Sequence, residues 1–193
     1  MASSARQTVV VAIFGTRGSG KDVLARAYVR QGYAHLKFAA PLKDAVQRLF
    51  GFTDAQVHGA PELGQTGDPR ELPSAWGPSP RRVLQFVGTE LFQHGLAKLL
   101  PGVGRDFWAR SLVESVKLAG HDRVVVSDMR FPHELEALRA EGWTVRAVRV
   151  RRAGGLREDD DASLHASETE LDAILPDAVV ENDGVSPMEC PTE

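Results

Sequence analysis

Residues 15–22 read Gly-Thr-Arg-Gly-Ser-Gly-Lys-Asp, and the types and spacing of these residues suit the binding of phosphate. Gly15, Gly20 and Lys21 fit the G-x-x-x-x-G-K pattern of a phosphate-binding loop. Glycine lets successive backbone N–H groups turn toward phosphate oxygens, while the lysine adds a positive charge. We therefore expect this loop to bind a nucleotide through Gly15, Thr16, Arg17, Gly18, Ser19, Gly20, Lys21 and Asp22.

A carboxylate, Asp22, follows the lysine where this type of loop usually has the serine or threonine that binds Mg²⁺. Aspartate can cap the helix and reach the metal through water, but its negative charge lies beside the phosphates. A second carboxylate, Asp128, ends an apolar run at the position where open α/β sheets bind ligands. We predict that Asp22 and Asp128 anchor Mg²⁺. The alternative for Asp128 is a solvated strand end with an incidental ion pair.

Phosphoryl transfer requires positive charge around the moving group, and arginines close to the predicted strand ends can supply it. Arg130 follows Asp128 by two residues, and Arg151 and Arg152 follow the predicted strand 144–150. The predicted catalytic residues are Lys21, Arg130, Arg151 and Arg152. Residues 151–168 are expected to form a lid over the phosphates. A basic surface turn, balanced by the acidic run at 158–161, is the alternative.

A further polar group lies on a helix that Ser79 and Pro80 are expected to begin. Arg82 and Gln85 are three residues apart and share one face, which can bind a monophosphate and the edge of a base. Structural salt bridges are the alternative. The segment before it, 59–79, is predicted to be a mobile excursion over a cleft or a tolerated surface insertion.

The order of the predicted elements places these groups on a parallel sheet. Apolar runs predict strands at 9–14, 33–38, 123–128, 144–150 and 178–181, and helical periodicity predicts helices at 22–31, 42–50, 80–92, 107–118 and 132–140. Strands alternating with helices predict an α/β fold with a mostly parallel sheet and right-handed crossovers.

Composition limits the remaining function classes. The chain has 193 residues, enough for one compact domain, and its net charge of −3 argues against broad binding of nucleic acid. Cys190 is the only cysteine and the histidines lack metal-ligand spacing, so neither a disulfide nor a zinc site is expected. We find no signal peptide and no apolar run long enough to span a bilayer, and we expect a cytoplasmic protein. The tail, 185–193, is expected to be frayed.

Seven segments, in this order, resemble the deoxynucleoside monophosphate kinases of tailed bacteriophages and other viruses: 15–22, Phe38-Ala-Ala-Pro-Leu-Lys43, Ser79-Pro-Arg-Arg82, Leu84-Gln-Phe-Val-Gly-Thr-Glu90, Asp106-Phe-Trp108, Ser127-Asp-Met-Arg130 and His165-Ala-Ser-Glu168. The resemblance implies a three-layer α/β/α P-loop fold that forms a single kinase domain over 1–193, with an acceptor-binding segment at about 39–105. It also implies transfer of a phosphoryl group from ATP, with Mg²⁺, to a deoxynucleoside monophosphate in the cytoplasm, that of the host if the protein is viral. The partners implied are small nucleotides, with a homodimer possible.

The resemblance also assigns further residues to the site. The acceptor residues it implies are Lys43, Arg82, Gln85, Thr89, Glu90 and Arg130, and Asn182 and Asp183 are placed where such kinases bind adenine. Animal-type phosphomevalonate kinases share the Gly-Lys-Asp loop and the Ser-Asp-x-Arg strand end, and they remain an alternative. A P-loop switch that binds ATP without an acceptor is an alternative of another class.

Overall fold

The computed structural model describes residues 7–59, 67–152 and 170–191. The chain divides into two compact units, which are treated in turn. The first unit consists of Met1–Phe38 and Ala109–Glu193, and the second of Ala39–Trp108. The helical segment predicted at about 39–105 falls in the second unit, and the phosphate-binding loop falls in the first.

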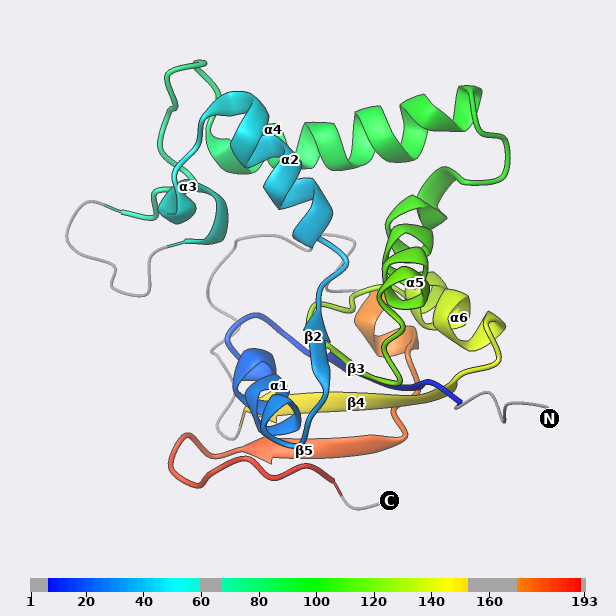
Figure 1. The fold of residues 1–193 in the computed structure, drawn as a ribbon. Coiled ribbons are helices and arrows are strands. Elements are labelled where there is room, and N and C mark those ends of the chain that lie inside the picture. Colours follow the sequence, from blue (N-terminus) through cyan, green and yellow to red (C-terminus); the bar gives the residue numbers. More distant parts are fainter. Residues whose placement is uncertain (1–6, 60–66, 153–169, 192–193) are drawn as a thin grey trace. The chain divides into compact units, whose positions relative to one another are not determined.

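The first unit contains a five-stranded sheet in the order β2-β3-β1-β4-β5, and every neighbouring pair is parallel (Figure 1). The strands are β1 (Val9–Phe14), β2 (Ala34–Leu36), β3 (Arg123–Val126), β4 (Thr144–Arg152) and β5 (Ala178–Asn182). The predicted parallel sheet is thus confirmed. Strand β1 is central and its last five residues are buried, as a near-continuous apolar run in a parallel sheet requires.

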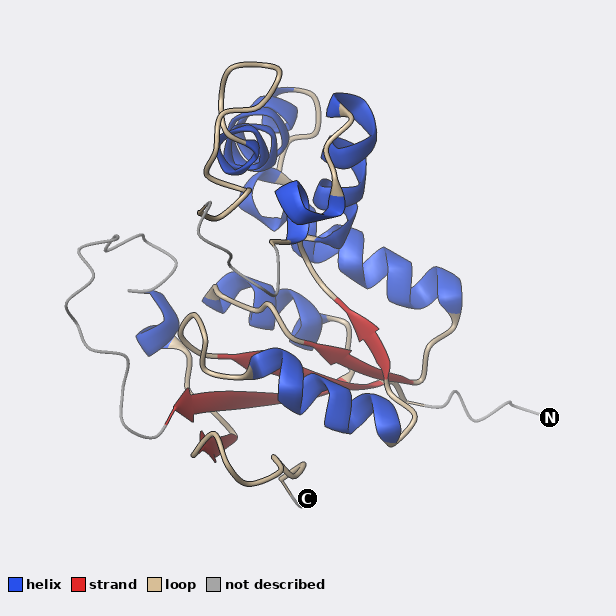
Figure 2. Cartoon of the chain, turned by 90° about the vertical axis from the view of Figure 1, so that its left-hand side faces the viewer, coloured by secondary structure: helices blue, strands red, loops and turns tan. Residues whose placement is uncertain are grey.

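Helices cover both faces of this sheet and make three layers (Figure 2). On one face, α5 (Phe107–Ala119), α6 (Pro132–Ala140) and the short 3-10 helix η4 (Glu170–Ala173) pack on alternate residues of β1. On the other face, α1 (Lys21–Arg30) packs on the residues of β1 between them. Successive side chains of β1 therefore pack alternately into two separate cores, one on each face of the sheet. The predicted α/β/α fold is confirmed.

Strand β2 is shorter than the predicted 33–38. It ends at Leu36 because Lys37 and Phe38 leave the sheet: the backbone N–H of Phe38 donates to Asp128 Oδ1 at 2.9 Å instead of to a neighbouring strand. Strand β4 is longer than predicted and carries the pairing to Arg152, opposite Asn182 of β5. Both differences occur at the carboxyl edge of the sheet, where the predicted site residues lie.

The second unit is helical and has its own core. Its elements are α2 (Ala40–Phe50), α3 (Asp54–His58), α4 (Pro80–Gln85), η1 (Phe86–Gly95), η2 (Leu96–Lys98) and η3 (Gly104–Asp106). Val46, Phe52, Val57, Val83 and Val87 form the buried cluster. Helix α3 was not predicted. Thr53 caps it by accepting from the backbone N–H of Gln56, whose side-chain oxygen accepts from the N–H of Thr53 in return.

The helix predicted at 80–92 is confirmed, but its second half is not an α-helix. From Phe86 the chain continues without a break as the π-helix η1 (Figure 1). A π-helix is wider than an α-helix because its hydrogen bonds run from residue i to i+5. Gly88 lies inside η1, and its carbonyl oxygen accepts a hydrogen bond from Trp108 Nε1 at 3.1 Å. Trp108, twenty residues further along the chain, thus donates a hydrogen bond to the backbone of η1, and π-helices are a rare helix type.

The frayed tail predicted at 185–193 is wrong for the described residues 185–191. Met188 is buried among Val11, Ile13 and Tyr28 on the α1 face of the sheet, and the carbonyl of Pro191 accepts from Arg146 Nη1 at 3.0 Å. The segment has no regular structure, but its apolar side chain packs into the core. Of the described helices, none is both long and apolar enough for a membrane span.

Candidate functional site

The loop between β1 and α1 has the shape that its glycines allow. Gly15, Gly18 and Gly20 all have positive φ, at 146°, 75° and 105°. A Cβ atom on Gly15 would collide with the carbonyl oxygen of Val150, and one on Gly20 would collide with the side chain of Asn182. Only glycine therefore fits these two positions, where the loop passes close to Val150 of β4 and Asn182 of β5.

Lys21 is the first residue of α1, so its ammonium group and the positive end of the helix dipole lie together. Its Nζ donates to the carbonyl oxygens of Gly15 and Thr16, each at 2.7 Å. The lysine thus folds back over its own loop. This places a positive charge at the loop, as the pattern of glycines and lysine predicts.

Residues at the ends of β4 and β5 also contact the loop. Arg152 Nη1 donates to the carbonyl of Gly18 at 3.4 Å, and Asn182 Nδ2 donates to the carbonyl of Ser19 at 2.8 Å. The structure therefore brings Arg152 and Asn182 to the loop, although the two residues are far from it in sequence. Arg151 is exposed next to Arg152, and the rest of the predicted lid lies outside the described residues.

Asp183, also predicted at the nucleotide, uses its carboxylate within its own turn. Its oxygens accept from the backbone N–H groups of Val185 and Ser186 and from the Ser186 hydroxyl, at 2.7–2.9 Å. These hydrogen bonds, first of all those from Ser186, lower the pKa of Asp183 to about 2. Its side chain therefore shapes the end of β5.

The two carboxylates predicted to bind metal lie at the carboxyl edge of the sheet. Asp22 Oδ1 accepts from Lys37 Nζ at 2.8 Å and from Ser127 Oγ at 2.9 Å, and Asp128 Oδ1 accepts from the N–H of Phe38 at 2.9 Å. Lys37 and Phe38 are adjacent in sequence, and so are Ser127 and Asp128. Lys37 and Ser127 both bind Asp22, while Phe38 binds Asp128. Burial would raise the pKa of Asp22, but the hydrogen bonds from Lys37 and Ser127 outweigh it, and its pKa is lowered.

These groups fit a magnesium ion bound together with a nucleotide. The side chain of Asp22 is 64% exposed and offers hard oxygen ligands. Over 7–59, 67–152 and 170–191, no group of three or more His, Cys, Asp or Glu residues can hold a metal alone. Mg²⁺ usually binds through one or two carboxylates plus substrate phosphates and waters, so this donor set matches that mode.

The sequence analysis did not assign Lys37 or His35 to the site, and it included Ser127 only in the segment 127–130 that resembles the kinase family. Ser127 is 2% exposed, donates to Asp22, and its oxygen lies 2.8 Å from His35 Nε2. Burial, and then the charge of Lys37, lower the pKa of His35. The only signal in the sequence was position: all three residues fall at or near the ends of the predicted strands 33–38 and 123–128, which meet at one edge of a parallel sheet.

Arg130 is exposed at the turn that follows β3, and a buried carboxylate shapes this turn. Glu134 Oε2 accepts from the backbone N–H groups of Arg130 and Phe131 at 2.7 and 3.1 Å. Glu134 is 7% exposed, and this burial raises its pKa to about 7 in spite of the two backbone hydrogen bonds. The turn that carries Arg130 out of the sheet is therefore fixed by α6.

The acceptor residues predicted on the second unit are carried by three of its helices. Arg82, Gln85, Thr89 and Glu90 are all exposed on α4 and η1, and Lys43 is half-buried on α2. Glu90 is paired with His94 at 3.1 Å. Arg130, the sixth predicted acceptor residue, belongs to the first unit.

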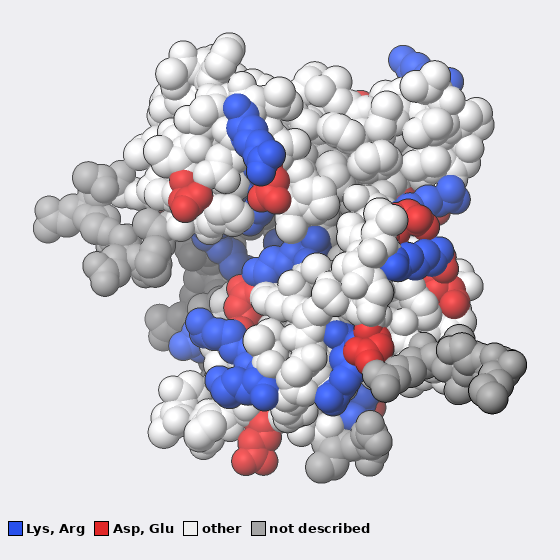
Figure 3. Space-filling model, viewed as in Figure 1, with Lys and Arg blue, Asp and Glu red and all other residues white. Residues whose placement is uncertain are grey.

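Charges on the face drawn in Figure 3 are mixed, with acidic side chains among the basic ones.

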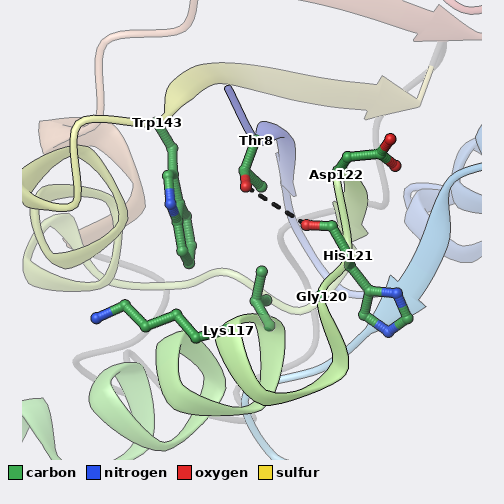
Figure 4. Close-up of a pocket in the computed structure, with 7 residues that line it drawn as sticks. Thr8, Lys117, Gly120, His121, Asp122 and Trp143 are labelled. Carbon is green, nitrogen blue, oxygen red and sulfur yellow. Dashed lines mark hydrogen bonds between the residues drawn. The ribbon is translucent and has the colours of Figure 1, made fainter. Parts of the chain in front are cut away.

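A hollow at the other edge of the sheet is lined by Thr8, Val116, Lys117, Gly120, His121, Asp122 and Trp143 (Figure 4). Thr8, Asp122 and Trp143 directly precede β1, β3 and β4. This hollow therefore lies at the amino ends of the strands, away from the phosphate-binding loop.

Residues 74–187, more than half of the chain, match the family model of the deoxynucleotide monophosphate kinases. Over 174 residues the chain is 34% identical to a protein of Acanthamoeba polyphaga mimivirus that is provisionally named as a deoxynucleotide monophosphate kinase; the match covers 86% of this chain and 83% of that protein. Among solved structures, TT1252 from Thermus thermophilus is 17% identical, with 93% of this chain and 91% of that chain covered and a TM-score of 0.42. Dephospho-CoA kinase from Campylobacter jejuni is 9% identical, with 90% and 87% covered and a TM-score of 0.42.

Proposed function

The chain belongs to the deoxynucleotide monophosphate kinase family, and from this premise we propose that it transfers the γ-phosphoryl group of ATP, with Mg²⁺, to a deoxynucleoside monophosphate. The products are ADP and a deoxynucleoside diphosphate. The observation that carries the proposal is the convergence of β4 and β5 on the loop, where Arg152 and Asn182 contact the carbonyls of Gly18 and Ser19.

Each residue of this edge has a role in the proposed reaction. The loop 15–22 and Lys21 bind the phosphates of ATP, Asp22 and Asp128 hold Mg²⁺, and Mg²⁺ when bound neutralises charge on the transferring group. Arg152 lies at the loop and Arg130 at the end of the neighbouring strand β3, so both can stabilise the charge that develops on the phosphoryl oxygens. Arg151 is assigned to the lid and Asn182 and Asp183 to the adenine.

The acceptor is assigned to the second unit. Arg82, Gln85 and Thr89 are exposed on one helical surface, and they combine a guanidinium group for phosphate with an amide and a hydroxyl group for a base edge. Lys43 and Glu90 complete this group. Such a surface has no purpose in an ATP-binding switch, and family membership favours nucleotides over phosphomevalonate.

The test is an assay of ADP release with ATP and Mg²⁺, run against each deoxynucleoside monophosphate, phosphomevalonate and no acceptor. We expect turnover with at least one deoxynucleoside monophosphate and none with phosphomevalonate. The variant K21A should lose at least about a thousandfold in kcat, since the charge on the phosphates is removed, with an unchanged melting temperature.

Two outcomes contradict the proposal. Turnover only with phosphomevalonate moves the same site to another acceptor, and slow hydrolysis without any phosphorylated product favours the switch. The variant R123A is the matched control, because Arg123 lies at the amino end of β3, where it stacks on Tyr33. It should keep kcat within about twofold of the parent protein, as expected of an exposed residue outside the site.

A further inference from the structure

The carboxylate of Asp22 is already occupied by a cation of the chain itself. Lys37 Nζ lies 2.8 Å from Asp22 Oδ1, and Lys37 belongs to the short segment that follows β2. Asp22 lies where a neutral serine or threonine is usual, so the phosphate site carries an additional negative charge. Lys37, in the segment after β2, neutralises this charge.

This ion pair differs from an ordinary surface pair because a buried hydroxyl fixes one side of it. Ser127 is 2% exposed and gives its single proton to Asp22 Oδ1 at 2.9 Å. The Ser127 oxygen is then left to accept from His35 Nε2 at 2.8 Å. The chain of contacts from His35 through Ser127 holds the Asp22 oxygen in one place, and Lys37 binds that same oxygen.

The two partners of the pair differ in freedom. Ser127 cannot move away from Asp22, because it is buried at the end of β3 between β1 and β2. Lys37 is 38% exposed and lies on a flexible four-carbon stem, and the carboxylate of Asp22 is 64% exposed to an incoming ion. An ion that takes over the Asp22 oxygen therefore displaces Lys37 and leaves Ser127 in place.

We propose that Lys37 is a positioning residue that occupies the Asp22 carboxylate and keeps a divalent cation from binding there until the cation arrives with a nucleotide. The nucleotide phosphates then receive the displaced ammonium group. This inference rests on the proposed function for the identity of the metal and of the nucleotide. Its test below uses neither nucleotide nor acceptor, so its failure and that of the proposed function are separate results.

The test is titration of the nucleotide-free full chain with Mn²⁺, followed by the loss of the electron paramagnetic resonance signal of free Mn²⁺. The variant K37M should bind Mn²⁺ about tenfold more tightly than the parent chain, the equivalent of one lost charge-assisted hydrogen bond. K37R keeps the charge and should restore the weak binding of the parent. D22N/K37M should lose the gain, because the released ligand is then absent.

Loss of any positive charge favours a cation to some extent, so K117M serves as the matched control. Lys117 is an exposed lysine of α5, paired with Glu141 at 2.7 Å and located at the amino ends of the strands, and its removal should change the Mn²⁺ affinity at Asp22 less than twofold. Equal Mn²⁺ affinity in the parent chain and K37M overturns the proposal. It is also overturned if the gain of K37M persists in the D22N background, or if K37R binds Mn²⁺ as tightly as K37M. K37Q repeats the test should K37M fold poorly.

Discussion

At the scale of single residues, the buried carboxylate of Glu134 fixes the turn that carries Arg130, and burial of its charge lowers the stability of the fold. It receives the N–H groups of Arg130 and Phe131, which would otherwise lack partners at the start of α6. The same burial that protects these hydrogen bonds disfavours the charged carboxylate and raises its pKa from 4.5 to about 7. The negative charge of Asp128 acts in the same direction.

This pKa has a consequence for stability that the variant E134Q isolates. Between pH 4.5 and about 7 the folded chain keeps a proton on Glu134 that the unfolded chain releases, so the contribution of Glu134 to stability falls as the pH rises. Relative to the parent chain, E134Q should therefore be more stable at pH 8 than at pH 5 by about 2.5 kcal/mol. Urea unfolding at both pH values measures this difference.

The other carboxylates are the same in the parent chain and in E134Q, so their contributions to the pH dependence of stability cancel in the comparison. Asp22, Asp68 and Asp183 have lowered pKa values, so their effects on stability have the opposite sign and fall at lower pH. If the free energy difference between parent and E134Q is the same at pH 5 and pH 8, Glu134 titrates as an ordinary carboxylate. The account of its burial would then be wrong.

At the scale of elements, the π-helix η1 depends on a partner outside its own sequence. A π-helix closes wider turns than an α-helix and is rare, so its persistence over Phe86–Gly95 calls for support from tertiary contacts. Trp108 supplies one such contact through its Nε1 to the carbonyl of Gly88, and its ring packs against Phe92 at 5.0 Å. The exposed residues Thr89 and Glu90 are carried by this helix.

We expect W108F to lower the free energy of unfolding by about 1 kcal/mol, because the phenyl ring keeps much of the packing but loses the hydrogen bond to Gly88. W76F is the matched control. Trp76 Nε1 donates to the carbonyl of Phe50, but this side chain is 59% exposed, so water replaces the lost donor and the loss should stay below about 0.5 kcal/mol. Equal losses in the two variants, measured by urea unfolding, would contradict the special role of Trp108.

The strands could be predicted and the π-helix could not, for a physical reason. A strand buried on both faces, such as Val9–Phe14, needs an unbroken apolar run, and that signal is local. Gly88 of η1 accepts a hydrogen bond from Trp108, twenty residues away in sequence, and no local pattern encodes this contact. The same holds for Lys37 and Ser127: each lies near the end of a predicted strand, but their meeting at Asp22 depends on the strand order β2-β3-β1.

At the scale of the whole molecule, the first unit encloses its sheet with segments from both ends of the chain. The residues of β1 point alternately to two cores, one covered by α5 and α6 and the other by α1 and residues after β5. The tail 185–193 contains two prolines and was expected to fray as terminal segments commonly do. In the structure the buried side chain of Met188 and the hydrogen bond from Arg146 to the carbonyl of Pro191 hold this segment on the sheet.

Met188 is 8% exposed, and the molecule is expected to depend on it. M188A should lower the free energy of unfolding by about 2 kcal/mol, near the low end for a buried methionine because the site is at the rim of the core. V185A is the control, since Val185 is 89% exposed and its truncation should cost less than about 0.5 kcal/mol. Met188 Cε also lies close to Gly20 of the phosphate-binding loop. Faster amide hydrogen exchange at 18–22 in M188A, but not in V185A, would show that the segment after β5 supports the loop; equal exchange in both variants would confine its role to the core.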